Sequence, residues 1–101
     1  MVLSEVIRVK EIKLGNGKKF IGFEIDLPGA PLVLIKGEKG FVMCGYLNID
    51  VVNKLGTIAA RVTGVKTVED MLKSVIKEAS EKAIEEGIKP GMKVEEVLSK
   101  I

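Results

Sequence analysis

The segment Gly40-Phe41-Val42-Met43-Cys44-Gly45-Tyr46-Leu47-Asn48 decides the fold of this chain. In it, an apolar run ends in a small thiol and a glycine, and a short helical pattern follows. The sequence before this segment has β-like patterns, whereas the sequence after it has mainly helical ones. The segment therefore marks the point at which a β-rich half is expected to join a helical half.

The N-terminal half is predicted to form two hairpins. Residues 2–13 read as a strand whose imperfect alternation indicates a bulge or burial on both faces. Gly15-Asn16-Gly17 is a hairpin signal, because both residues of Asn-Gly tolerate positive φ. Residues 20–27 alternate cleanly, and residues 32–35 form an apolar run typical of a strand buried on both faces. Gly37-Glu38-Lys39-Gly40 predicts the second hairpin turn.

A parallel crossover is predicted next. Asn48 suits the N-cap of a short helix over residues 49–55, which Gly56 would end. Residues 57–62 then read as a strand. A strand, a short helix and a strand in succession indicate a compact parallel crossover, which places the C-terminal ends of both strands at one edge of the sheet.

The remaining chain is predicted to be helical. The longest helix would begin after Thr67 and end at Gly87, and a short one would cover residues 94–101. One apolar stripe on the long helix is expected to face the sheet. The stripe consists of Val68, Met71, Leu72, Val75, Ile76 and Ala79. We therefore predict a single α+β domain over residues 1–101, with a mixed, mainly antiparallel sheet built from two hairpins plus one further strand and helices packed on one face.

Composition favours self-association. Hydrophobic residues make up 47% of the 101 residues, which is rather apolar for a small monomer and predicts a patch covered by another subunit. The N-terminal β region, about residues 1–35, is the expected surface. With a net charge of +2 and 4% aromatic residues, nucleic-acid binding is not expected.

The sequence also suggests a location and a source. A single Cys excludes an internal disulfide and suits a reducing cytoplasm. The start of the chain lacks signal-peptide architecture, and no apolar run is long enough to span a bilayer, so we expect no membrane association. His, Trp and Gln are absent, and Lys and Glu dominate the charged positions, a trend typical of thermophile proteins.

Three stretches together resemble the YunC-like family of small bacterial and archaeal proteins. They are residues 40–48, 60–67 and 87–92. The resemblance covers almost the whole chain and is most specific over residues 40–92. It implies an α+β fold and a tetramer formed through the N-terminal β region. Because the family is a domain of unknown function, the resemblance supplies neither a reaction nor a catalytic residue.

Two places could carry chemistry. Cys44 stands at a strand end, where a helix N-terminus or Arg61 would lower its pKa, although the absence of His excludes a Cys-His pair. The alternative is a small buried hydrophobe. The strand-to-helix loop after Arg61 could instead hold an anion on its amides, or could simply cap a helix. The candidate ligand-binding residues are Gly45, Asn48, Arg61, Thr63, Gly64, Lys66 and Thr67.

Three hypotheses therefore remain for function. The first is a cytoplasmic homo-oligomer that binds a small anionic ligand. The second is an enzyme that uses Cys44 with Arg61 in acyl or thiol chemistry, and the third is a structural or interaction module. Glu24, Asp26 and Asp50 read as solvated strand and cap positions. No metal site or other cofactor is expected, because the chain has no His and one Cys.

Overall fold

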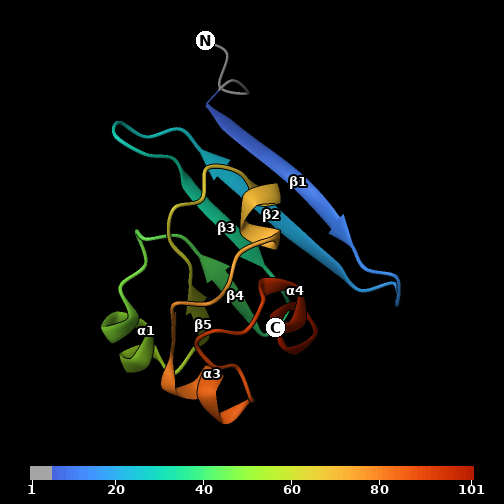
Figure 1. Cartoon of the computed structure of the whole chain (residues 1–101), viewed down its shortest axis with the longest axis vertical. Coiled ribbons are helices and arrows are strands. Elements are labelled where there is room, and N and C mark those ends of the chain that lie inside the picture. The colour runs from blue at the N-terminus through green and yellow to red at the C-terminus, as the bar shows by residue number, and fades with distance from the viewer. Residues whose placement is uncertain (1–5) are drawn as a thin grey trace.

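The computed structural model describes residues 6–101 as one six-stranded sheet with short helices (Figure 1). The strands are β1 (Ile7–Lys13), β2 (Lys19–Ile25), β3 (Leu32–Lys36), β4 (Gly40–Met43), β5 (Ile58–Arg61) and β6 (Glu78–Ala79). The helices are α1 (Ile49–Leu55), α2 (Val68–Leu72), α3 (Glu81–Glu85) and α4 (Val94–Val97), followed by a 3-10 turn at Leu98–Lys100. Residues 2–5 of the expected first strand lie outside the described residues.

The strands follow one another across the sheet in chain order, β1-β2-β3-β4-β5-β6. Every pair is antiparallel except β4 and β5, which are parallel and joined by α1. The predicted α+β class and the parallel crossover are therefore confirmed. The β1–β2 register runs without interruption from Ile7 opposite Ile25 to Lys13 opposite Lys19, so the expected bulge is wrong over the paired residues.

One face of the sheet carries the main core. Phe20, Val33, Ile35, Val42 and Ala60 point to this face and are almost fully buried. The helix α2 packs against β2 and β3, and α4 packs against α2; in Figure 1, α4 lies next to the C-terminal end of the chain. Burying a side chain of the size of Val, Ile or Phe stabilises a fold by roughly 1.5–3 kcal/mol, so this layer contributes strongly to stability.

Gly22 allows α2 to approach the sheet closely. A Cβ atom at this position would lie 2.8 Å from Cγ2 of Val68, the first residue of α2. Such a contact is shorter than packed carbon atoms tolerate. A glycine in β2 is therefore required by the packing of α2, although its backbone is ordinary strand.

The helix α1 packs on the other face, at the β5 end. Ala59 alternates with Ile58 and Ala60, so its side chain points away from the main core, and it is nevertheless fully buried. α1 contacts β5 and buries Val52 there. A right-handed crossover places the connecting helix on one fixed side of its strands. Here α1 projects above the surface of the sheet next to β4, and we call this projection the raised edge.

The rest of this second face, on β1 to β4, forms what we call the open face. Its apolar side chains are Ile7, Val9, Ile21, Phe23, Ile25, Leu32, Leu34, Phe41 and Met43. Ile7 is 43% exposed and Val9 is 62% exposed, and the other seven are half-buried. The expectation that residues 32–35 are buried on both faces is therefore wrong for the single chain, because Leu32 and Leu34 lie on the open face.

The predicted long helix after Thr67 is wrong. The chain leaves the helix after Leu72, pairs with β5 as β6, and enters α3 at Glu81. The amide of Lys77 donates to the Arg61 carbonyl at 2.8 Å, and the hydroxyl of Ser80 caps α3. β-branched residues at 75 and 76 weaken a helix, and the edge of β5 offers backbone hydrogen bonds instead. Val75 is consequently 41% exposed and does not face the sheet.

Candidate functional site

The predicted loops do meet at one edge of the sheet. A cavity of about 350 Å³ lies between three loops, residues 29–31, 44–46 and 64–66. We call it the loop cavity. Residues 44–46 follow β4 and residues 64–66 follow β5, so the parallel pair brings their C-terminal ends together as predicted. The Tyr46 hydroxyl donates to the Ala30 carbonyl at 2.8 Å and holds the first two loops together.

Cys44 forms part of the cavity wall but belongs to the core. Its side chain is 4% exposed, and Sγ accepts a hydrogen bond from the Val33 amide at 3.4 Å. The position follows from the alternation of β4, in which Val42 and Cys44 point to the main core. This burial matches the alternative in which Cys44 serves as a small hydrophobe.

Arg61 faces the other side of the sheet. It stands opposite Met43 of the open face and forms an ion pair with Glu78. It borders a separate polar hollow of about 420 Å³ near the start of α1. Although Cys44 and Arg61 lie at the same sheet edge, their side chains point to opposite faces. The combination of thiol and guanidinium on which the enzyme hypothesis depends is therefore not assembled.

The helix starts at this edge are already capped by the chain. The Asn48 side-chain oxygen accepts from the amides of Asp50 and Val51, at 3.0 and 3.4 Å. At α2, the Thr67 hydroxyl accepts from the Asp70 amide at 3.0 Å, and the Asp70 carboxylate accepts from the Lys66 amide at 3.1 Å. These bonds satisfy the amide groups that an anion would otherwise use.

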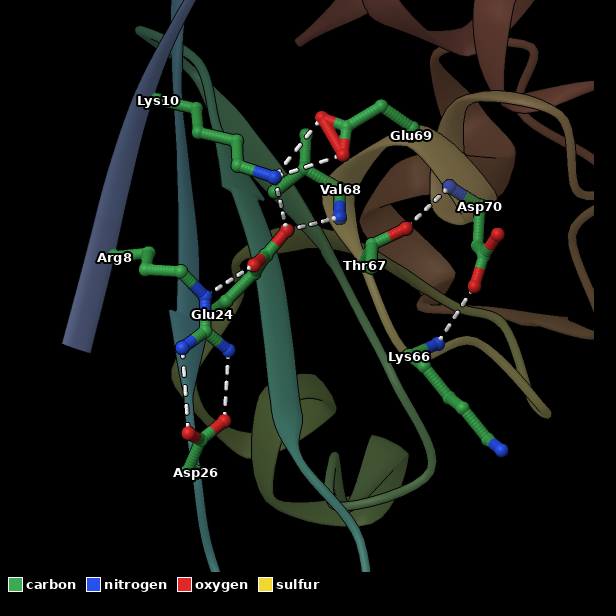
Figure 2. Close-up of polar contacts among 9 residues, drawn as sticks. All are labelled: Arg8, Lys10, Glu24, Asp26, Lys66, Thr67, Val68, Glu69 and Asp70. Carbon is green, nitrogen blue, oxygen red and sulfur yellow. Dashed lines mark hydrogen bonds and ion pairs between the residues drawn. The ribbon is translucent and has the colours of Figure 1, made fainter. Parts of the chain in front are cut away.

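Three of the candidate ligand-binding residues, Gly45, Gly64 and Lys66, line the loop cavity, and Thr63 does not. Thr63 is exposed, and Gly64 has a φ of +74°, a conformation that favours glycine. A Cβ atom built on Gly45 would meet no atom within 4 Å, so this glycine leaves open space beside the cavity. The Lys66 side chain is exposed and points away from the neighbouring carboxylates (Figure 2). Within residues 6–101, no carboxylate forms an ion pair with its ammonium group.

A buried ionic cluster surrounds Glu24, and the sequence patterns did not predict it. This side chain is 1% exposed and accepts from Arg8 Nε at 2.8 Å and from Lys10 Nζ at 2.7 Å. The Val68 amide donates to it at 2.7 Å, and Lys10 also reaches Glu69 of α2 at 2.7 Å (Figure 2). Glu24 thus ties β1 and α2 to β2, and its interpretation as a solvated position is wrong.

The charge state of Glu24 follows from these contacts. Burial alone raises the pKa of this carboxyl, but hydrogen bonds from Arg8, Lys10 and the Val68 amide outweigh it and lower the pKa from 4.5 to about 2. The hairpin register could have revealed the cluster. It places Arg8 directly opposite Glu24 and Lys10 opposite Gly22, so both cations share the face of Glu24.

Metal-binding clusters and membrane-spanning helices are both absent from the described residues. Within the described part of the chain, no group of three or more His, Cys, Asp or Glu side chains is arranged to hold a metal ion. None of the helices in residues 6–101 combines the length and apolar character needed to cross a bilayer.

The sequence profile of a known family, the domain of unknown function DUF1805, matches residues 43–101. The chain belongs to this family. It is 29% identical over 90 residues to the uncharacterized protein YunC of Bacillus subtilis (strain 168), covering 85% of this chain and 89% of YunC. The resemblance inferred from residues 40–92 is thereby confirmed.

The fold also matches that of a relative whose structure has been solved. The crystal structure of TA1206, a protein of unknown function from Thermoplasma acidophilum, superposes with a TM-score of 0.89. TA1206 is 48% identical to this chain, and the match covers 93% of this chain and 91% of TA1206. Both relatives are uncharacterised, so the comparisons agree with the fold and leave the function to be argued from the site.

Proposed function

We propose that this DUF1805 protein works as a homo-oligomer whose subunits associate through the open face. One observation supports this proposal: nine apolar side chains on one face of β1 to β4 remain exposed or half-buried in the single chain. Contiguous apolar surfaces of this kind mark interaction sites in soluble proteins. A tetramer is the size we propose, because the family resemblance implies it and dihedral symmetry commonly gives four subunits.

A second copy is the partner that explains the open face most simply. An antiparallel sheet commonly packs one face on its own core, and an apolar second face can be covered by stacking on another sheet. Each subunit exposes the same face, so one two-fold axis covers both at once and forms a dimer. In the proposed tetramer, two such dimers associate through a second contact. The cytoplasm is the proposed location, because Cys44 is free and buried, as expected in a reducing compartment.

Matched substitutions test the surface. Val9→Asp places a carboxylate on the open face, and Ile84→Asp places one at a similarly apolar position, 49% exposed on α3. Light scattering after size exclusion should give the oligomer mass for the unmodified chain and for Ile84→Asp. Val9→Asp should shift the mass toward a monomer. Equal masses for the two variants would place the contact surface elsewhere.

A small anionic ligand in the loop cavity is our second proposal. The specific observation is the Lys66 ammonium at the cavity rim, which has no carboxylate partner among residues 6–101. Gly45 and Gly64 leave space there, and one unpaired cation beside an apolar cavity suits an anion with a short apolar body. Cysteine chemistry is less favoured, because Arg61 faces away from the Cys44 thiol.

A thermal-shift screen of small carboxylates and phosphates tests this second proposal. A ligand that binds only the folded chain raises the melting temperature as its concentration rises. The shift should disappear in Lys66→Met and persist in Lys89→Met, which removes an equally exposed lysine elsewhere. If no anion shifts the unmodified chain, the third hypothesis, a structural or interaction module, takes its place.

A further inference from the structure

We propose that β1 of a second copy fills a cavity on the open face beside α1, so that two subunits stack with their two-fold axis parallel to the strands. This inference rests on the proposed self-association and specifies its geometry. The cavity, which we call the α1-side cavity, measures about 290 Å³. Leu34, Phe41 and Met43 line its sheet side, and the turn over residues 37–40 and Thr57 border it.

The first step is that the α1-side cavity and the exposed strand β1 lie at opposite edges of the open face. The α1-side cavity lies on β3 and β4, next to the raised edge that α1 forms over β5. The most exposed apolar side chain of the open face, Val9, lies on β1, at the other edge. In Figure 1, β1 extends away from the helices at the side of the sheet opposite α1.

The second step concerns layer thickness. A packed sheet and a packed helix each add a layer roughly 10 Å thick. A second sheet on the open face would therefore occupy the same layer as α1, with its outer strand against the flank of α1. If the two-fold axis instead lay in the interface and ran perpendicular to the strands, β1 would stack on β1 of the partner. α1 would then meet α1 of the partner, and the two helices would keep the sheets from touching.

The third step uses the strand register. Val9, Phe23, Leu34 and Met43 form one row across the open face, and Glu11, Ile21, Lys36 and Phe41 form the next. An axis parallel to the strands reverses the strand order and keeps each row level. β1 of the partner then lies over β4, and Val9 of the partner subunit lies over Met43.

The fourth step is charge complementarity. The same register places Glu11 of the partner subunit over Phe41, one strand away from Lys36 at the rim of the α1-side cavity. Among residues 6–101, the ion-pair partner of Glu11 is Lys19, at 3.6 Å and with both side chains more than half exposed. Such a pair is weak, so the carboxylate remains available to a cation across the interface.

Cross-linking distinguishes the two axes. Val9→Cys and a mass-tagged Met43→Cys are prepared separately in a Cys44→Ala chain, mixed, and treated with a short bis-maleimide. The expected product is a mixed dimer of Val9→Cys with Met43→Cys, and Val9→Cys alone should give none. A cross-linked dimer of Val9→Cys alone would overturn the proposed axis, as would the absence of any mixed dimer.

Charge reversal provides an independent test of the proposed axis. Glu11→Lys and Lys36→Glu should each weaken self-association about tenfold at low salt, and the double variant should recover most of the loss. Lys89→Glu, on an exposed loop away from the sheet, is the control and should change nothing. If the unmodified chain forms an oligomer but the double variant does not recover self-association, the proposed axis is wrong and the self-association itself stands. A monomeric unmodified chain contradicts the self-association on which it rests.

Discussion

Replacing Glu24 with Gln should destabilise the chain more than any other carboxylate-to-amide change. The side chain is 1% exposed, and its pKa is lowered from 4.5 to about 2 by contacts that favour the charged form. At about 1.36 kcal/mol per unit, that shift corresponds to roughly 3 kcal/mol at neutral pH. Because Arg8 and Lys10 are partly exposed, with 40% and 34% of their side chains accessible, we expect a loss of about 2–3 kcal/mol.

Chemical denaturation followed by circular dichroism measures this loss. The Glu24→Gln variant and the unmodified chain are unfolded in urea at pH 7 and at one protein concentration, since association adds to apparent stability. Glu86→Gln, an exposed carboxylate beyond α3, is the control and should change the free energy of unfolding by less than about 0.5 kcal/mol.

The acid range gives a second measurement of the same variant. The folded-state pKa of Glu24 lies below its unfolded value, so its contribution is complete above about pH 4.5 and disappears as the pH falls toward about 2. Glu24→Gln should flatten this part of the profile and leave the smaller contribution of Asp26, whose pKa Arg8 also lowers. An unchanged acid profile, together with a loss below about 0.5 kcal/mol at pH 7, would refute the reasoning.

Three further predictions concern packing and reactivity. Met71→Ala should cost about 2–5 kcal/mol in urea unfolding, because Met71 is fully buried on α2; a loss below about 1 kcal/mol would mean that α2 does not pack on the sheet. Gly22→Ala should cost about 1–3 kcal/mol, since the new Cβ would lie 2.8 Å from Val68, and the added change Val68→Ala should then cost less than it does alone. Cys44 should react slowly with iodoacetamide in the native chain and rapidly in denaturant, because its side chain is 4% exposed; fast native labelling would revive the enzyme hypothesis.

Local signals in the sequence were sufficient for much of the fold. Asn16-Gly17 set the first hairpin, and Asn48 and Gly56 correctly bounded α1, because turns and caps depend on residues close in the chain. The strand-helix-strand pattern then correctly predicted that the loops after β4 and β5 are neighbours, because parallel strands end at the same edge of a sheet. These features require only backbone preferences that one or two residues determine.

Tertiary contacts decided what the sequence could not show. The stripe over residues 68–79 has helical spacing, but the edge of β5 takes Glu78 and Ala79 into the sheet, so distant pairing overrides a local pattern. Glu24 alternates with Phe23 and Ile25 in β2 and resembles a solvated position until Arg8 and Lys10 are placed beside it. Likewise, Cys44 and Arg61 share an edge, and only the strand alternation reveals that they point to opposite faces.

Sedimentation equilibrium of the unmodified chain at micromolar concentrations tests the central claim, that the open face is covered by a second copy. Each subunit has a mass of 10.9 kDa. The open face predicts a species at an integer multiple of this mass, four-fold for the proposed tetramer, that persists across the concentration range. A single species of 10.9 kDa at every concentration would contradict the claim and leave the apolar face of β1 to β4 for a different partner.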